Sequence, residues 1–152
     1  MQLSQRGIQF ICSFEGFSSK PYLDVRGIPT IGYGTTHYPD TGKTVSLTDP
    51  AISTVQGLNY LKLHIDKEVS GWVNQHLPGL GQCQFDAVVS FCYNVGIGNF
   101  SHSHLIDAIA HHLSCAEITT DFDMFNKSGG KVINGLIRRR TAEANLYCNC
   151  KY

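Results

Sequence analysis

The stretch FEGFSSKPYLDVRGIPTIGYG, Phe14 to Gly34, combines acidic, aromatic and glycine residues in a segment too short to form a domain. Upstream of it, Gly7, Phe10, Ile11 and Phe14 recur at helical spacing, which predicts a short amphipathic helix over residues 3–15 that ends at Gly16. Glu15 would then lie at the negative end of the helix dipole, beside two phenylalanines. Both surroundings favour the protonated form of its carboxyl group.

The second half of the stretch has the pattern of short strands and tight turns. From Pro21 to about Tyr38, β-favouring residues alternate with glycine-containing turn sequences, which predicts a small antiparallel sheet. Asp24 falls where the first strand meets its turn, and Thr30 falls in the next strand. A hairpin would therefore bring Asp24 and Thr30 close together.

Helical periodicity dominates the rest of the chain. Asp49 and Pro50 are a suitable N-cap and first helical residue for a long helix that reaches about Trp72, with a possible break near Gly57 or Gly71. Further helices are predicted around residues 85–92, 105–113 and 136–147. Glycine-containing segments at residues 77–81 and 94–100 separate them.

The composition is that of an ordinary folded domain. The chain has 152 residues, 42% of them hydrophobic and 16% charged, and its formal net charge is zero. A neutral chain has no long-range field to attract nucleic acid or an acidic membrane, so neither is expected as a partner. No apolar run is long enough to span a bilayer, and the first residues lack the apolar core of a signal peptide. We therefore expect synthesis in the cytoplasm and no membrane insertion.

The six cysteines and seven histidines form no familiar site pattern. No CxxC pair occurs, so buried thiols are the default interpretation, although Cys148 and Cys150 are close enough in sequence for oxidation to be considered. The histidine spacings fit no standard structural zinc site. We predict no metal and no organic cofactor.

The acidic residues of the opening stretch suit the cleavage of a glycosidic bond. This reaction needs one carboxylic acid to protonate the leaving oxygen and a second carboxylate to activate water or to attack the sugar. Glu15 suits the acid, and Asp24, on a polar turn, suits the ionised partner. The order Glu15, Asp24, Thr30 within FEGF…PYLD…G…TIGYG resembles the signature of the phage-type lysozymes, glycoside hydrolase family 24. The segments QFDAVVSFCYNVGIGNF (84–100) and GLIRRRTAEANLY (135–147) resemble the helical segments of phage endolysins.

This resemblance implies a fold and an activity. The fold would be α+β and mainly helical, a single lysozyme-like domain over residues 1–152. A small antiparallel-sheet lobe, about residues 16–48, would be joined by a long helix to a larger helical lobe, about residues 75–152 plus the N-terminal helix. The activity would be that of an endolysin that hydrolyses the β-1,4 bond between N-acetylmuramic acid and N-acetylglucosamine in peptidoglycan.

The resemblance also implies roles for particular residues. Glu15 would be the general acid, with Asp24 and Thr30 holding the attacking water. An arginine of the triplet at 138–140, by register Arg138, would pair with Glu15 and orient it. Asn94 would border the cleft from the helical side.

Two further positions near the signature have open interpretations. Gly32 would permit a backbone turn or the close approach of a sugar. Tyr33 would stack on a sugar ring or belong to the core. The sequence departs from the family's frequent pattern directly after TIGYG, where a histidine is usual. Here Thr35 and Thr36 come first, and His37 follows them. This removes a histidine that usually braces the sheet lobe.

Two other functions remain open. A lytic transglycosylase needs only the glutamate and forms an anhydro sugar without water, whereas an inactive peptidoglycan-binding module would be expected to lack one of the acids or the threonine. For the hydrolase we expect a monomer acting on peptidoglycan glycan strands. It would be made without a signal peptide in the host bacterial cytoplasm and released to the wall through a holin.

Overall fold

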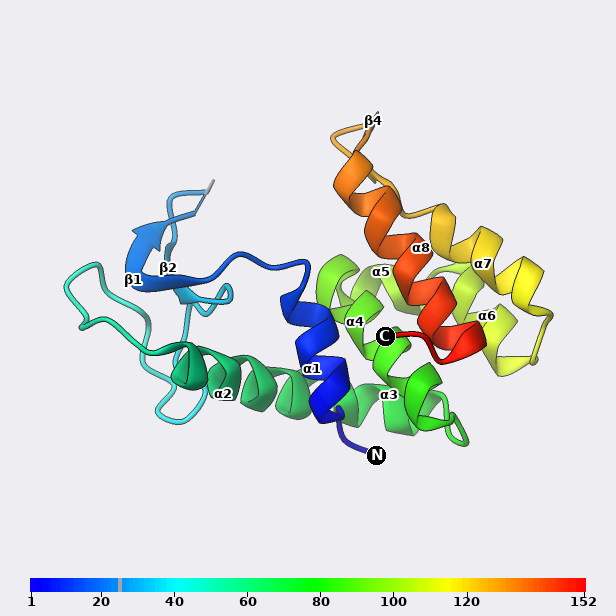
Figure 1. The fold of residues 1–152 in the computed structure, drawn as a ribbon, viewed down its shortest axis with the longest axis horizontal. Helices are drawn as coiled ribbons and strands as arrows, with labels where there is room; N and C mark the ends of the chain where they lie inside the picture. The colour runs from blue at the N-terminus through cyan, green and yellow to red at the C-terminus, as the bar shows by residue number, and fades with distance from the viewer. Residues whose placement is uncertain (25) are drawn as a thin grey trace.

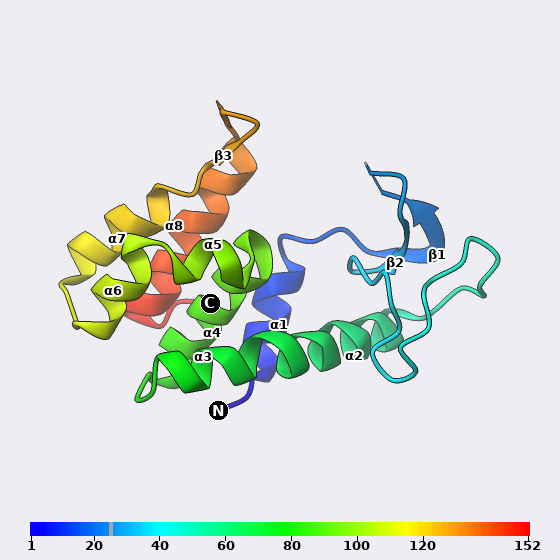
Figure 2. The same cartoon turned by 180° about the vertical axis from the view of Figure 1, so that it is seen from behind.

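The computed structural model describes residues 1–24 and 26–152, and its fold is mainly helical with a small antiparallel sheet. Figure 1 shows the sheet lobe at one end and the helical lobe at the other, with a long helical segment running beneath both. The view from behind in Figure 2 shows the same separation, with both chain termini on the helical lobe. The predicted fold class is therefore confirmed.

The first helix, α1 (Gln5–Cys12), ends earlier than the sequence pattern predicts. Ser4 caps its start, because the Ser4 hydroxyl accepts a hydrogen bond from the Gly7 amide at 2.9 Å. Its end is at Ser13, so the predicted cap at Gly16 is wrong. Glu15 therefore lies in an irregular segment three residues beyond the helix, and not in its last turn. Tight turns there direct Glu15 toward the last helix of the chain.

The position of α1 on the helical lobe is fixed by Asp86 of α4 (Gln82–Val95). This buried carboxylate accepts hydrogen bonds from the Ser4 amide at 3.1 Å and from the Tyr152 hydroxyl at 2.7 Å, so it ties both chain ends to α4. A Cβ atom at Gly7 would come within 2.6 Å of the Asp86 carboxyl carbon. Glycine is therefore required where α1 approaches α4, and this approach sets the place of Glu15.

The sheet lobe is built on the predicted hairpin. Strands β1 (Ser18–Leu23) and β2 (Pro29–Gly32) are antiparallel, with Tyr22 opposite Thr30 and Leu23 opposite Pro29. Beneath the hairpin lies a small separate core of Ile31, Val45 and Ile52. Tyr38 and Tyr60 pack against this core, and the Ile52 amide donates a hydrogen bond to the Ser19 carbonyl at 2.8 Å, which ties β1 to the segment before α2.

The long helical segment begins later than predicted. Helix α2 (Thr54–Ile65) is capped by Ser53, which forms a capping box with Gln56. The predicted cap, Asp49, is wrong, because its carboxylate instead accepts hydrogen bonds from the Ser46 amide at 2.8 Å and the Tyr38 hydroxyl at 3.0 Å. Asp49 thus closes a turn of the sheet lobe.

The segment continues without interruption from α2 into a helical stretch of the π type, η1 (Asp66–Ser70), and then into α3 (Gly71–His76). Gly57 does not break it, since that residue is buried inside α2 against the Phe17 and Tyr33 rings. The irregularity lies just before Gly71, where the hydrogen bonding changes type.

The helical lobe surrounds α4. Helix α8 (Asn134–Asn149) packs along α4, and α7 (Cys115–Asp123) packs along α8. The predicted break after α4 is confirmed at Gly96, whose φ is +86°, and the short helices α5 (Ile97–Ser101) and α6 (His104–Ala110) follow. Helix α7 and the small hairpin of β3 (Lys127–Ser128) and β4 (Lys131–Val132) have no counterpart in the sequence prediction. The hairpin leads directly into α8.

Two disulfides, which the cysteine spacing does not predict, link the end of α8 to other helices. Cys83 at the start of α4 joins Cys150, and Cys115 at the start of α7 joins Cys148. The Cα atoms of these pairs lie 5.2 and 5.8 Å apart, within the range that a disulfide spans. The interpretation of all six as buried thiols is therefore wrong for these four, and Cys148 is not paired with Cys150. Each has a partner from another helix that only the folded chain brings near.

Candidate functional site

Asp24 and Thr30 both form hydrogen bonds with the backbone of Ile28 in the hairpin. The Asp24 carboxylate accepts hydrogen bonds from the amides of Arg26 at 2.8 Å and Ile28 at 2.9 Å, both through Oδ1. The Thr30 hydroxyl donates to the Ile28 carbonyl at 2.9 Å, and the Asp24 amide donates to the same carbonyl at 3.0 Å. The hairpin thus brings Asp24 and Thr30 together, as the sequence predicts.

These contacts keep the Asp24 carboxyl group ionised. The hydrogen bond from the Ile28 amide, supported by the amide and guanidinium of Arg26, lowers the pKa of Asp24 below its ordinary value. The Arg26 Nε lies 3.4 Å from Oδ2. The two amides both bind Oδ1. Oδ2, which has only the long contact with Arg26, is therefore the carboxylate oxygen with more room for a further hydrogen bond.

Glu15 is held by Arg139, and not by Arg138 as the sequence register predicts. Arg139 Nη1 donates to Glu15 Oε1 at 2.6 Å. The Arg139 side chain is only 4% exposed, whereas that of Glu15 is 26% exposed. Arg138 is exposed on another side of α8. The correction follows from helix geometry, because a shift of one residue turns a side chain by about 100° around the helix.

Behind this pair lies a buried carboxylate, Glu143, one turn further along α8. Glu143 accepts a hydrogen bond from Arg139 Nε at 3.0 Å and one from the Ser90 hydroxyl at 2.7 Å, and its other oxygen lies 2.7 Å from Arg140 Nε as an ion pair. Burial raises the pKa of Glu143, and the two guanidinium groups oppose that shift. Sequence reasoning missed Glu143, although its spacings from the two arginines place all three on one helix face.

Asn94 joins the same network through Arg140. Arg140 Nη2 donates to Asn94 Oδ1 at 2.9 Å, and the guanidinium carbon lies 4.8 Å from the centre of the Phe91 ring. Asn94 itself is exposed at the end of α4. Of the predicted helical-lobe residues, Asn94 is therefore connected to Glu15 through side chains of α8, while Arg138 is not.

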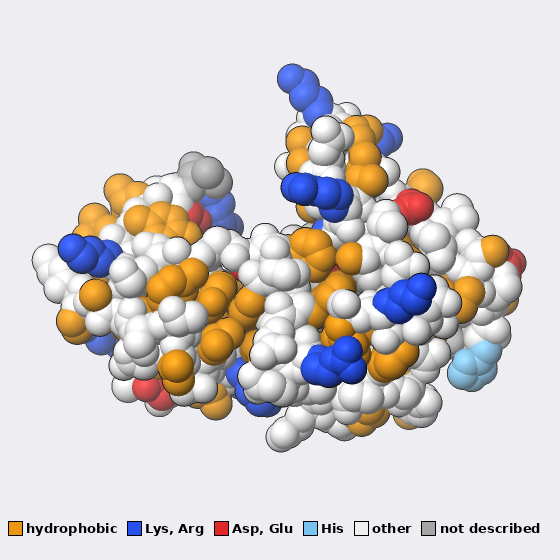
Figure 3. Space-filling model, viewed as in Figure 1, with side chains coloured by type: hydrophobic (Ala, Val, Ile, Leu, Met, Phe, Trp, Pro, Cys, Tyr) orange, Lys and Arg blue, Asp and Glu red, His pale blue; other side chains and the backbone are white. Residues whose placement is uncertain are grey.

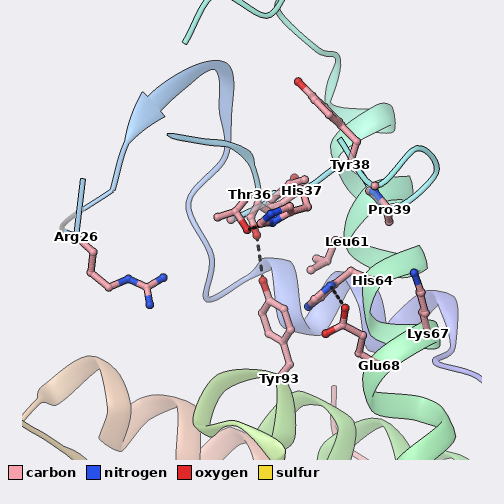
Figure 4. Close-up of a pocket in the computed structure, with 14 residues that line it drawn as sticks. Arg26, Thr36, His37, Tyr38, Pro39, Leu61, His64, Lys67, Glu68 and Tyr93 are labelled. Carbon is pink, nitrogen blue, oxygen red and sulfur yellow. Dashed lines mark hydrogen bonds and ion pairs between the residues drawn. The ribbon is translucent and has the colours of Figure 1, made fainter. Parts of the chain in front are cut away.

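A recess separates the sheet lobe from the helical lobe. Figure 3 shows this face hollowed between the sheet lobe and the projection that carries β3 and β4. A cavity of about 420 Å³ lies between the lobes, lined by the loop at residues 33–39 and by Leu61, His64 and Tyr93. In Figure 4 the Arg26 side chain extends into this space from the hairpin, while Tyr93 rises from α4. Glu15, Asp24 and Thr30 do not line the cavity itself.

Tyr93 links the cavity with Glu15. Its hydroxyl donates to the Tyr33 carbonyl at 3.0 Å, which connects α4 to the sheet lobe. Burial raises the pKa of Tyr93, and the negative charge of Glu15 raises it further. Burial and then Glu15 also raise the pKa of the Cys12 thiol to about 11. Both shifts include the negative charge of Glu15, and of these two groups only Tyr93 lines the cavity.

The structure shows the surroundings of Gly32 and Tyr33, each of which has two interpretations from the sequence. Gly32 has a φ of +65°, which favours glycine, and a Cβ atom there would make a tight contact of 3.2 Å with the end of the Ile52 side chain, so the backbone turn is the main reason for glycine. The Tyr33 ring is 9% exposed and packs on Phe17 with a centroid distance of 5.1 Å. Tyr33 therefore belongs mainly to the core, although its edge lines the cavity.

The histidines take part in pairwise contacts. Within residues 1–24 and 26–152, no three His, Cys, Asp or Glu side chains gather closely enough to hold a metal ion. His104 instead pairs with Asp121 at 2.9 Å on the surface, and this contact raises the pKa of His104. His64 lies 3.6 Å from Glu68 at the cavity wall.

The chain belongs to the phage lysozyme family, since the family model for phage lysozymes matches residues 12–143. It is 40% identical to an endolysin of Bacillus phage PZA over 97% of this chain and 55% of that protein, and 32% identical to the endolysin of Salmonella phage P22 over 97% of this chain and 98% of that protein. The chain thus spans about half the length of its Bacillus phage relatives.

Solved structures have the same fold. An endolysin from Escherichia coli O157:H7 phage FAHEc1 matches with a TM-score of 0.88 and 34% identity over 100% of this chain and 96% of the other. A point mutant of P22 lysozyme matches with a TM-score of 0.85 and 30% identity over 97% of this chain and 98% of the other. In the described part of the chain, every helix is too short or too polar to cross a membrane.

Proposed function

We propose that this chain is a muramidase that hydrolyses the β-1,4 bond between N-acetylmuramic acid and N-acetylglucosamine in peptidoglycan. The observation that carries the proposal is the pairing of partly exposed Glu15 with buried Arg139, in the segment that leads from α1 into the hairpin of Asp24. Two carboxyl groups with different surroundings are what glycoside hydrolysis requires. Membership of the phage lysozyme family supports the same activity.

In the proposed reaction Glu15 is the general acid. It donates its proton to the oxygen that leaves the anomeric carbon, so that bond breaking does not create an alkoxide. Arg139 fixes one carboxyl oxygen of Glu15 and leaves the other for the proton and the substrate. Because Arg139 is buried, it holds that orientation while the Glu15 side chain stays partly exposed to a ligand.

Asp24 and Thr30 are proposed to hold the attacking water. The Thr30 hydroxyl already donates its hydrogen to Ile28, so toward a water it can only accept. The ionised Asp24 accepts as well, chiefly through Oδ2. A water that gives its two hydrogens to these acceptors directs its lone pairs toward the sugar, and Asp24 takes its proton as the new bond forms.

This arrangement predicts inversion at the anomeric carbon. The water would attack the face opposite the departing oxygen, which converts a β-linked glycan into an α-anomeric product. Proton NMR recorded before mutarotation distinguishes the outcomes. An initial β-anomer, or a glycosyl ester trapped on Asp24, would contradict the water-holding role of Thr30.

The lytic transglycosylase is the second candidate activity. It would need no held water and would leave an anhydro end on the muramic acid residue. Digestion of purified peptidoglycan followed by mass spectrometry of the muropeptides separates the two reactions, because hydrolysis adds water and leaves a reducing end. An inactive binding module would bind the glycan and release no fragments.

Three positions are proposed to contact the glycan. Asn94 has its amide oxygen occupied by Arg140, which orients its amide hydrogens for donation to a sugar. On the sheet lobe the proposed contacts come from Tyr33, which lines the cavity, and from the adjacent backbone at Gly32. For the chain in its host we propose monomeric action on glycan strands, with synthesis in the cytoplasm and release to the wall through a holin.

A further inference from the structure

The buried carboxylate of Glu143 has no role in the proposed reaction steps. It lies on α8 at four residues from Arg139 and at three from Arg140, so the three side chains share the face that packs on α4. All three are buried, with exposed fractions of 4% or less. Burying a charge this deeply costs free energy unless opposite charges compensate it. Here two guanidinium groups form ion pairs with one carboxylate.

Each of these arginines reaches onward to a different residue at the recess. Arg139 contacts Glu143 through Nε and Glu15 through Nη1, at 3.0 and 2.6 Å. Arg140 lies against Glu143 through Nε and donates to Asn94 through Nη2, at 2.7 and 2.9 Å. One carboxylate thus stands behind both the proposed acid and the proposed sugar contact.

We propose that Glu143 is a positioning residue that fixes Glu15 through Arg139 and Asn94 through Arg140. The inference rests on the proposed function, since it assigns Glu143 to the hydrolysis of peptidoglycan. Its content is geometric: Glu143 accepts a hydrogen bond from Arg139 Nε and forms an ion pair with Arg140 Nε that lacks hydrogen-bond alignment, and these contacts set the direction in which the Nη groups of each arginine point.

The physical reason lies in the fork shape of the guanidinium group. Its donors are fixed relative to one another, so holding Nε sets the direction of the Nη hydrogens. Arg139 and Arg140 also donate long hydrogen bonds to the Ser90 and Phe125 carbonyls, at 3.4 and 3.5 Å. Without the carboxylate, the two adjacent guanidinium groups would repel each other inside the lobe, and these long bonds alone would not fix their orientation. A displacement of about 1 Å at a catalytic group is enough to cost roughly 100-fold in rate.

The first test is a double-mutant cycle on kcat, measured with soluble glycan oligomers below the melting temperature. Glu143→Gln in the unmodified chain should lower kcat by about 10- to 100-fold. In an Arg139→Gln background the same substitution should change kcat less than about threefold, because its route to Glu15 is already removed. Effects that multiply independently would overturn the route through Arg139.

The second test concerns substrate binding through Asn94. Glu143→Gln should raise KM by about 2- to 10-fold, the usual range for one misdirected hydrogen bond. In an Asn94→Ala background no further rise is expected. A KM that rises equally in both backgrounds would overturn the second half of the proposal.

Matched variants separate positioning from general loss of stability. Ser90→Ala removes the hydrogen bond that the same carboxylate accepts from an uncharged hydroxyl and keeps both ion pairs, so kcat should stay within about threefold of the parent. Leu105→Ala, in the core on α6, should lower the melting temperature without splitting kcat from KM. If Leu105→Ala reproduced the kinetic pattern of Glu143→Gln, the positioning role would be wrong.

A shorter acid covers the case in which Glu143→Gln does not fold. Glu143→Asp keeps the charge and shortens the side chain by one methylene group, so it cannot contact both guanidiniums as before. A folded Glu143→Asp variant with parental kcat and KM would overturn the proposal, and a folded variant with reduced kcat supports it. Failure of the proposed function is separate, because the unmodified chain would then release no reducing ends from peptidoglycan.

Discussion

The two carboxylates of the site, Asp24 and Glu15, are held by opposite means. Asp24 takes its hydrogen bonds from amides two and four residues along the chain, within a single turn. Glu15 takes its ion pair from Arg139, which is 124 residues away in the sequence. The first arrangement is complete as soon as a hairpin forms, and the second requires the whole helical lobe.

This difference matches the cores beneath them. The sheet lobe has a small core of Ile31, Val45 and Ile52, while the helical lobe has an extended core that includes α1, α4 and α8. In the sheet lobe, with its small core, Asp24 is held by local hydrogen bonds. In the helical lobe, with its large core, Arg139 is buried and held in an orientation that contacts Glu15. The proposed catalytic pair would therefore combine a base held by local contacts with an acid held by the packing of the whole helical lobe.

The sharpest way to test the comparison is Glu15→Gln. We expect the rate of peptidoglycan hydrolysis to fall by about 100- to 10,000-fold, because the amide cannot protonate the leaving oxygen. The helical circular dichroism signal and the melting cooperativity should stay close to those of the parent, since Glu15 lies at the recess and not in the core. Turbidity loss and reducing-end release measure the rate.

Glu117→Gln is its matched control. Glu117 closes the capping box of α7, and glutamine also fits that position. This variant should lyse at the parental rate. Parental activity in Glu15→Gln would move the acid role to another residue.

The arginine triplet offers the next largest effect. Arg139→Ala removes one partner from buried Glu143, so we expect the free energy of unfolding to fall by about 3–5 kcal/mol, together with a loss of activity. Arg138→Ala, at an exposed position, should change it by less than about 0.5 kcal/mol. Urea unfolding of both variants measures the contrast. Equal losses of unfolding free energy in Arg139→Ala and Arg138→Ala would mean that Arg139 is not the arginine buried beside Glu143.

The disulfides test the global side of the comparison. Cys83→Ser opens the link to Cys150, and we expect the free energy of unfolding to fall by about 2–4 kcal/mol under oxidising conditions. The physical reason is that the link restricts the unfolded chain. In a reducing agent the variant and the parent should become nearly equal. If the urea midpoint of the parent protein were the same with and without the reducing agent, the disulfide would be absent in solution.

The smallest expected effect on stability is that of the Asp24 carboxylate, and it depends on pH. Its pKa is lowered in the folded state, so its ionised form stabilises the fold above the pKa of the unfolded chain, about 3.9, and this contribution is lost as pH falls through the folded pKa. The difference in melting temperature between the parent and Asp24→Asn should therefore be present near neutral pH and should vanish at strongly acidic pH. A difference that persists at the acidic end would mean that the carboxylate charge is not its source.

Local features were the ones predictable from the sequence. The turn after β1, the strand that carries Thr30 and the break at Gly96 are set by neighbouring residues, so their patterns are visible without a structure. Boundaries were less accurate. Helix α1 ends before Glu15 and α2 starts at Ser53, because Asp49, a good cap by type, finds better partners in the sheet lobe.

The sequence by itself determined the chemistry available to this protein: an acid after an amphipathic helix, an aspartate on a turn, a threonine on the next strand, and an arginine triplet. Only the tertiary structure decided that Arg139 meets Glu15, that Glu143 lies behind it, and that Cys148 and Cys150 pair with different helices. The reason is that a turn is specified by residues a few positions apart. The choice among three consecutive arginines depends instead on the rotation of a helix against its neighbours, which the packing of the whole lobe sets.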